Sequence, residues 1–184
     1  MHQTGTLDIS NFDLYKVPRD GSCFYHAACM ALKNGFISYY SLKELSASLL
    51  RANTAAWMRG NPDFVICELP GGFRETLRNF SVGGVANGRM CKYWKRALAG
   101  VHRNSYADAA SIHAFACAHE VDVVVYSRVR GQPDQIEVRQ ICRPQSTQSP
   151  RLMVQVLIDW DSQHYDALIP REEARALPAL STLL

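Results

Sequence analysis

The chain of 184 residues lacks any hydrophobic stretch of membrane-spanning length, and no apolar segment follows a basic start at its N-terminus. A spanning helix needs about 20 consecutive apolar residues, so we expect no membrane segment and no secretory signal peptide. Long runs of one charge are also missing, since 20 Lys and Arg and 17 Asp and Glu are scattered, giving a net charge of +3. This distribution is typical of a solvated surface and argues against a nucleic-acid partner.

The cysteines form none of the common ligand or disulfide patterns. The chain has six cysteines but no Cys-x-x-Cys pair, which argues against a structural zinc site. Their spacing resembles no small secreted disulfide framework, and a chain of this length buries enough apolar surface to fold without one. We therefore expect free thiols, no bound metal and a reducing, cytoplasmic location.

Internal repeats, low-complexity tracts and clear linkers are absent, which indicates one domain. Residues 1–13 are expected to form a flexible lead-in, and residues 14–184 a single domain. Hydrophobic periodicity and turn residues predict a strand at 14–17, helices at 23–32, 41–60, 73–80, 90–100 and 105–120, strands at 121–126, 135–142, 152–160 and 164–169, and a short helix from Pro170. Ser41 and Glu44 have the spacing of a capping box at the start of the second helix. The expected fold class is α+β, with helices flanking a mainly antiparallel sheet.

One cysteine stands in a setting suited to reaction. The stretch PRDGSCFYHAA, residues 18–28, places Cys23 at the expected N-terminus of a helix, directly after Gly21 and Ser22. Only the thiolate attacks a carbonyl carbon, and the unpaired N–H groups and dipole at a helix start favour its negative charge. The backbone N–H groups of Gly21, Ser22 and Cys23 are candidates for an oxyanion hole. A structural cysteine before an ordinary helix is the alternative.

A candidate base lies near the other end of the chain, in the stretch DSQHYDAL at residues 161–168. On an extended strand, His164 and Asp166 share one face and Tyr165 takes the other. Asp166 can then accept a hydrogen bond from one imidazole nitrogen and leave the other for Cys23. A surface histidine that merely lies near an aspartate is the alternative. The side chain of His26 is expected to point away from the turn before Cys23.

These stretches resemble two motifs of the ovarian tumour (OTU) family of deubiquitinating cysteine proteases. DGSCFYHAA is similar to the Asp-Gly-x-Cys nucleophile motif, and HYDAL is similar to the His-aromatic-Asp/Asn motif, in the same order along the chain. YADAASIHAFACAHEVDVVVY is similar to the helix and strand that lie between them. The likeness covers residues 14–169 apart from 63–100, and it implies the papain-like OTU fold.

The resemblance also implies roles for individual residues. Cys23 is the implied nucleophile, His164 the general base and then acid, and Asp166 the residue that orients the imidazole. Asp20, at the first position of the nucleophile motif, belongs with Gly21 and Cys23 to the loop whose backbone forms the oxyanion hole. No metal or organic cofactor takes part.

The implied reaction is hydrolysis of the isopeptide bond after the C-terminal Gly-Gly of ubiquitin, through a thioester acyl-enzyme. The implied partners are ubiquitin, polyubiquitin or ubiquitin-like modifiers, without a nucleic acid or a membrane, and the protein is expected to be a monomer. The letters CFYH and the compact size are similar to the OTU domains of RNA viruses. A viral origin would imply action in the host cytoplasm and a role in immune evasion.

The middle of the chain departs from the family pattern. Where the family has Trp-Gly followed by Glu, this chain has Tyr106, Ala107 and Ser111. Tyr106, Trp160 and Tyr165 are candidates to line a channel for the Gly-Gly tail. Simple core packing is the alternative for each and is the favoured one for Tyr165. Residues 63–100 are expected to dock the body of ubiquitin, because specificity tends to lie in loop-rich parts of a scaffold.

Two alternative functions stay open. One is a viral protease that processes its own polyprotein and removes ubiquitin only secondarily. The other is a non-catalytic module that binds ubiquitin, which would be expected to lack one of the three implied catalytic residues. Cys23, His164 and Asp166 are all present, which favours an active enzyme.

Overall fold

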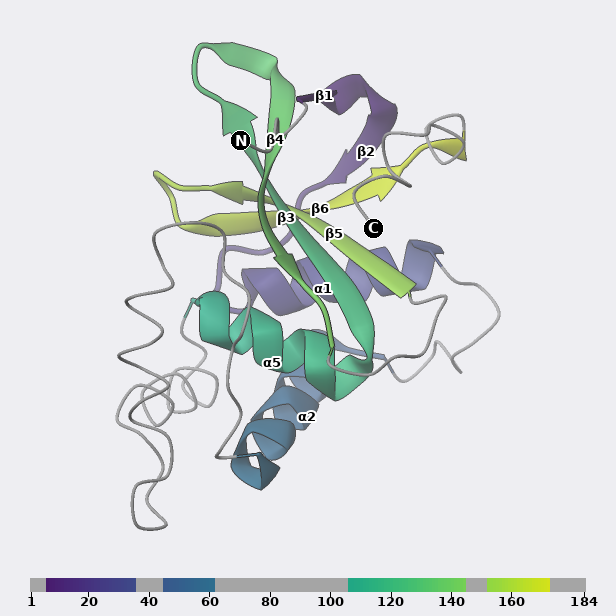
Figure 1. Cartoon of the computed structure of the whole chain (residues 1–184), viewed down its shortest axis with the longest axis vertical. Helices are drawn as coiled ribbons and strands as arrows, with labels where there is room; N and C mark the ends of the chain where they lie inside the picture. Colours follow the sequence, from purple (N-terminus) through teal and green to yellow (C-terminus); the bar gives the residue numbers. More distant parts are fainter. Residues whose placement is uncertain (1–5, 36–44, 62–105, 145–151, 173–184) are drawn as a thin grey trace.

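The structure, a computed structural model, describes residues 6–35, 45–61, 106–144 and 152–172. Its elements in chain order are β1 (Leu7–Asp8), the 3-10 helix η1 (Ile9–Asn11), β2 (Phe12–Tyr15), α1 (Cys23–Gly35), α2 (Ala47–Gly60), α5 (Ala109–His119), β3 (Val121–Val129), β4 (Gln132–Cys142), β5 (Leu152–Asp159) and β6 (His164–Pro170) (Figure 1). None of these helices combines the length and the apolar character that crossing a membrane requires.

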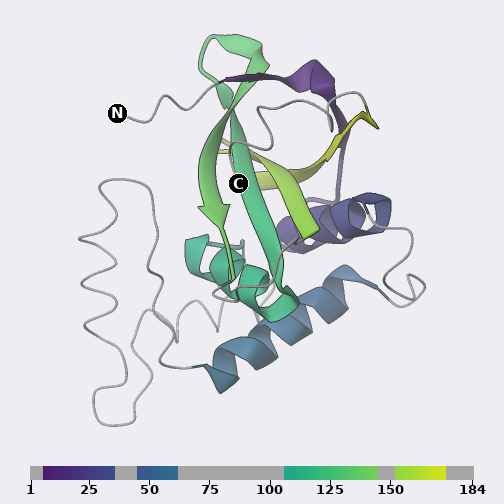
Figure 2. The same ribbon diagram turned by 45° about the vertical axis from the view of Figure 1, so that its right-hand side comes forward.

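The strands form one six-stranded sheet in the order β1-β4-β3-β5-β6-β2. β3 and β5 run parallel, whereas the other neighbouring strands are antiparallel. The helices α1, α2 and α5 gather on one side of this sheet (Figures 1 and 2). The predicted α+β class with a mainly antiparallel sheet is therefore confirmed.

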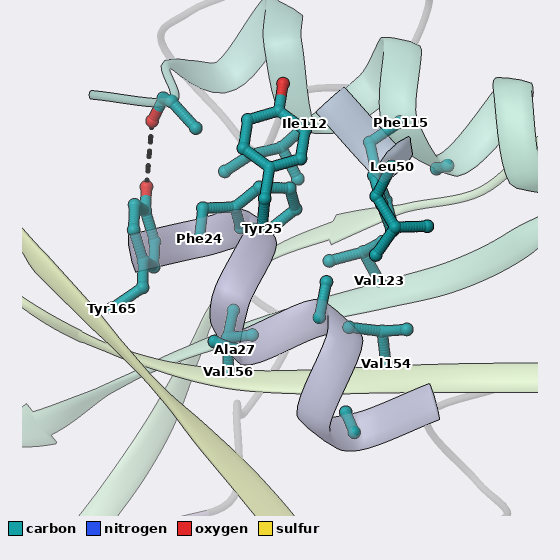
Figure 3. Packing of buried hydrophobic residues seen from close by; sticks show 14 of the residues in the cluster. Phe24, Tyr25, Ala27, Leu50, Ile112, Phe115, Val123, Val154, Val156 and Tyr165 are labelled. Atoms are coloured by element: carbon teal, nitrogen blue, oxygen red, sulfur yellow. Dashed lines mark hydrogen bonds between the residues drawn. The ribbon is translucent and has the colours of Figure 1, made fainter. Parts of the chain in front are cut away.

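Apolar side chains form a cluster on each face of the sheet. Successive residues of a strand face opposite sides, and Val123 and Val125 of β3 pack with the helices in the first cluster (Figure 3). Val124 and Tyr126 of the same strand belong to the second cluster, on the other face. Burial on both faces explains why β3 has a continuous apolar sequence instead of an alternating one.

The first helix lies close to the sheet because its inner face is small. α1 packs against β5 and β6, and the side chains of Ala27 and Ala28 are completely buried. Alanine at these positions lets the helix backbone approach the strands. Since α1 begins at Cys23, this packing also fixes the position of the thiol.

The N-terminal segment differs from the prediction of a lead-in over residues 1–13. β1 pairs Leu7 with Ile136 of β4, and β2 begins at Phe12, opposite Pro170 of β6. Leu7 and Ile9 pack against the second apolar cluster, which accounts for their place in the fold. Residues 1–5 lie outside the described residues.

Helix α2 begins at Ala47, and the capping box predicted at Ser41 and Glu44 lies outside the described residues. Ser46 is its N-cap, and the Ser46 side chain accepts a hydrogen bond from the backbone N–H of Leu49 at 3.2 Å. The hydroxyl satisfies one of the N–H groups that a helix start leaves without a partner. Pro170 is the last residue of β6, and helical conformation starts at Glu172, two residues later than predicted. The rest of that predicted helix and the helices predicted at 73–80 and 90–100 lie outside the described residues.

Truncation of a core aromatic side chain should weaken the fold strongly. Phe115 of α5 is fully buried and packs edge-on against Phe24 with ring centroids 5.2 Å apart. Phe115→Ala should lower the free energy of unfolding by about 3–5 kcal/mol, because it removes buried apolar surface and leaves a cavity. Leu49→Ala, at an exposed position of α2, is the matched control. It should change the free energy of unfolding by less than about 1 kcal/mol. Denaturant unfolding measures both, and equal losses would contradict this account of the core.

Candidate active site

The cysteine singled out by the sequence is the first residue of α1. Its side chain is buried, with 3% of the residue exposed. The loop before it turns at Gly21, whose φ of 73° is a left-handed conformation that glycine adopts without strain. The loop therefore delivers Cys23 to the point where α1 meets β6.

The Asp20 carboxylate fastens this loop. Its Oδ1 accepts a hydrogen bond from the backbone N–H of Ser22 at 2.9 Å, and its Oδ2 lies 3.1 Å from Nε2 of His26. The hydrogen bond from Ser22 lowers the pKa of Asp20, with a smaller contribution from His26. His26 thus points toward the turn, contrary to the prediction, because Asp20 attracts its imidazole.

A buried arginine on α2 also holds the loop. Nη2 of Arg51 donates to the carbonyl oxygen of Gly21 at 2.8 Å and to the hydroxyl of Ser22 at 3.0 Å. The guanidinium carbon lies 4.5 Å from the centre of the Tyr25 ring, in a cation–π contact. Arg51 is only 6% exposed, and sequence analysis did not identify it as part of the site.

His164 and Asp166 form the pair that their spacing predicts. Nε2 of His164 lies 3.0 Å from Oδ1 of Asp166, and both side chains are buried. A carboxylate only accepts hydrogen bonds, so Nε2 carries the proton and Nδ1 keeps a free lone pair. That lone pair can take a proton from a nucleophile.

Asp166 has two further partners that sequence analysis did not identify. Nζ of Lys16 lies 2.7 Å from its Oδ2, and the backbone N–H of Val17 donates to its Oδ1 at 3.2 Å. Both partners directly follow β2, which pairs with β6 and brings Tyr15 opposite Ala167. Together with His164, these donors fix the orientation of the carboxylate.

The two ends of the chain meet at Tyr165. Its backbone N–H donates toward the sulfur of Cys23, so the residue that directly follows His164 contacts the candidate nucleophile. The ring of Tyr165 packs edge-on against Phe24 with centroids 5.5 Å apart. The structure thereby brings Cys23 to the strand that carries His164 and Asp166.

The charge state of Cys23 reflects opposing effects. Burial raises the pKa of its thiol above the ordinary value, and the nearby Asp20 carboxylate adds to the rise. The N–H groups of Tyr165 and Phe24 act in the opposite direction, as expected at a helix start. Because burial dominates, a stable thiolate needs an additional positive charge, and a protonated imidazole at His164 would supply it.

The three aromatic residues predicted to line a channel lie in different environments. Tyr165 is buried in the core, and its hydroxyl donates to the carbonyl oxygen of Ala107 at 3.2 Å (dashed line in Figure 3). Its ring therefore packs in the core cluster that also contains Cys23. Tyr106 is half-buried and stacks on Tyr165 with centroids 5.1 Å apart, whereas Trp160 is 58% exposed in the turn before His164.

In the described part of the chain, no three His, Cys, Asp or Glu side chains cluster so as to hold a metal ion. The thiols of Cys23, Cys29 and Cys142 form no disulfide. The 63–100 segment, predicted to dock ubiquitin, lies outside the described residues.

The structure is similar to solved structures of OTU domains. The viral OTU domain protease from Taggert virus is 16% identical, with 91% of this chain and 86% of that chain covered and a TM-score of 0.54. The OTU of Hazara virus bound to ubiquitin is 14% identical, with 91% and 87% covered and a TM-score of 0.55. An OTU deubiquitinase from Wolbachia pipientis wMel bound to ubiquitin is 13% identical, with 88% and 98% covered and a TM-score of 0.54.

This chain has the OTU fold. The fold implied by the two sequence motifs is therefore confirmed. By sequence, the chain matches no protein-family model and no curated protein.

The pH dependence of alkylation tests whether His164 acts on Cys23 within this OTU fold. In His164→Gln, the rate of Cys23 alkylation by iodoacetamide should rise with a midpoint above the ordinary cysteine value of about 8.5, because burial raises the thiol pKa and no imidazolium opposes it. The wild type should show a lower midpoint, since a protonated His164 stabilises the thiolate. Cys23→Ala gives the background from the other thiols. Identical midpoints in the wild type and His164→Gln would refute the pairing.

Amide hydrogen exchange tests the role of Arg51. Arg51→Met removes both hydrogen bonds to the loop, so a peptide covering residues 18–24 should exchange faster, by about tenfold. A peptide from β6 should be unaffected. Arg59→Met, at an exposed position on the same helix, is the control. Equal exchange in the two variants would show that Arg51 does not hold the loop.

Proposed function

We propose that the chain is a cysteine-dependent deubiquitinase, which hydrolyses the isopeptide bond after the C-terminal Gly-Gly of ubiquitin or a ubiquitin-like modifier. The observation that carries this proposal is the placement of Cys23 against β6, where Nε2 of His164 lies 3.0 Å from the Asp166 carboxylate. Ubiquitin is the supported partner because two of the similar OTU domains are bound to it.

Acylation begins with proton transfer from Cys23 to Nδ1 of His164. The thiolate attacks the carbonyl carbon of the terminal glycine and forms a tetrahedral intermediate. The bond to the substrate lysine nitrogen then breaks, and the imidazolium gives its proton to the departing amine. Ubiquitin remains attached to Cys23 as a thioester.

Hydrolysis of the thioester returns the enzyme to its starting state. His164 takes a proton from a water molecule, whose oxygen attacks the thioester carbon. The carbon–sulfur bond breaks, the sulfur recovers the proton from His164, and ubiquitin leaves with a free carboxylate. Asp166 keeps the proton on Nε2 and stabilises the imidazolium that forms in both halves of the reaction.

Backbone N–H groups of the loop before α1 stabilise the oxyanion in this proposal. The N–H of Ser22 is committed to the Asp20 carboxylate, which leaves the N–H groups of Gly21 and Cys23 for the developing charge. Asp20 then contributes through the shape of the loop, and its carboxylate stays directed at Ser22 and His26. Such preorganised donors are among the strongest contributors to acyl-transfer catalysis.

A ubiquitin probe with an electrophilic C-terminus tests the nucleophile. The wild type should form a covalent adduct and Cys23→Ala should form none, as read by mass spectrometry. With a fluorogenic C-terminal ubiquitin amide, His164→Ala should lower kcat about 10²- to 10⁴-fold because the general base is lost. Asp166→Asn should lower kcat by a smaller factor, since the amide oxygen still accepts a hydrogen bond from Nε2 of His164.

Lys33→Ala, at the exposed end of α1, is the control and should react like the wild type. An adduct on Cys23→Ala would assign the nucleophile to another residue. Binding of ubiquitin without adduct formation by the wild type would instead identify a binding module. A side-by-side panel of diubiquitins then determines which linkage the enzyme prefers.

A further inference from the structure

A hollow opens beside Asp166, bounded by the segment after β2, the ends of β3 and β5, and the turn before β6. Its volume is about 660 Å³, within the range of about 300–1,000 Å³ that is usual for small-molecule sites. Buried Leu157 and Ile158 form part of its wall, and exposed Trp160 lies in its lining. Neither Cys23 nor His164 lines the hollow, whereas Asp166 belongs to both the hollow and the candidate active site.

Positive charge dominates the lining. Five cationic side chains and three carboxylates line the hollow: Lys16, Arg19, Arg128, Arg130 and Arg139, with Asp159, Asp161 and Asp166. Two of these cations are paired within the described residues, Lys16 with Asp166 and Arg139 with Glu137, each at 2.7 Å. Arg19, Arg128 and Arg130 have no ion-pair partner in that part of the chain.

Two of these unpaired arginines come from the hairpin between β3 and β4. Arg130 and Gly131 form its two-residue turn, and Gly131 has a φ of 79°, a left-handed conformation that glycine adopts without strain. Arg128 lies two residues earlier on β3 and donates to the carbonyl oxygen of Pro133. This contact holds the arginine against the hairpin and leaves its other donors for a ligand.

The carboxylates of the hollow are largely satisfied by neighbouring donors. Asp159 accepts from the hydroxyl of Ser162 at 2.6 Å and from the backbone N–H of Asp161 at 3.1 Å. Asp166 accepts from His164, Lys16 and Val17. Arg19 acts on the Asp159 carboxylate and contributes to lowering its pKa, whereas Arg128 and Arg130 form no ion pair with the described residues. The cations therefore exceed the carboxylates around the hollow, which favours an added anion.

We propose that this hollow binds a small ligand that carries two or more phosphate groups. Guanidinium groups recognise phosphate oxygens through paired, planar hydrogen bonds, and Arg19, Arg128 and Arg130 supply these groups around one cavity. Trp160 offers an aromatic face for a planar ring attached to the phosphates. The volume of about 660 Å³ fits a small molecule.

Lys16 couples this ligand to Asp166. Its side chain is 71% exposed while that of Asp166 is 6% exposed, so the ion pair faces the hollow from the protein side. A phosphate in the hollow competes with Asp166 for Lys16. Asp166→Asn removes the competing carboxylate charge. The substitution should therefore tighten phosphate binding.

The test is calorimetric titration of the whole protein with inorganic tripolyphosphate, without a turnover readout. The wild type should bind saturably with one ligand per chain, and Arg128→Gln/Arg130→Gln should weaken binding at least about tenfold. Lys33→Gln/Arg59→Gln removes the same charge at exposed positions on α1 and α2 and should bind like the wild type. Thermal unfolding confirms that both double variants are folded.

Equal weakening in the two double variants, or absence of saturable binding by the wild type, would overturn the proposal. A nucleoside triphosphate serves as a second ligand. If the nucleotide binds more tightly than tripolyphosphate and Trp160→Ala removes this difference, the ligand carries a ring. If the two ligands bind with equal affinity, the phosphate groups are the recognised feature. Binding of an acidic peptide or a single-stranded RNA without tripolyphosphate binding would also refute it. These outcomes are separate from the ubiquitin assays, so either proposal can fail alone.

Discussion

The edge-on packing of Phe24 against Tyr165 is the contact on which the site depends. One ring comes from the first turn of α1 and the other from β6, near the opposite end of the chain. Each aromatic residue is the immediate neighbour of a candidate catalytic residue, Cys23 in the first case and His164 in the second. Burial of these rings therefore sets the distance between nucleophile and base, so the hydrophobic core and the chemistry are parts of one arrangement.

Asp166 has an equally central place among the polar contacts. It joins His164 in the same strand to two groups from the segment after β2. The carboxylate is consequently held from both sides of the β2–β6 pairing, and it cannot reorient without disturbing that edge of the sheet. Its contact with Lys16 also connects the candidate active site to the cationic hollow on the other side of the ion pair.

The sequence predicted those features that depend on local pattern. The alternation along β6 places His164 and Asp166 on one face, and the start of α1 falls at Cys23 as its flanking residues indicate. The parts that were missed depend on pairing between distant segments. Lys16 reaches Asp166 only because β2 pairs with β6 in a particular register, which no local pattern reveals.

Other differences arise where two effects compete or where a pattern was present but overlooked. Arg51 lies on the buried face of α2 together with Leu50 and Thr54, and an arginine in such a stripe indicates a specific partner. The helix start lowers the pKa of Cys23 as expected, yet burial outweighs it, and burial depends on the whole fold. β1 has only two residues, too few to show the alternation that predicts a strand.

The position of β6 in the sheet has a consequence for biosynthesis. Although it is the last strand of the described chain, it lies between β5 and β2 and not at an edge. A nascent polypeptide still on the ribosome exposes Cys23 long before the strand that carries His164 has emerged. The candidate nucleophile thus has no candidate base until β6 has been synthesised, and the site is complete only when this strand enters the sheet.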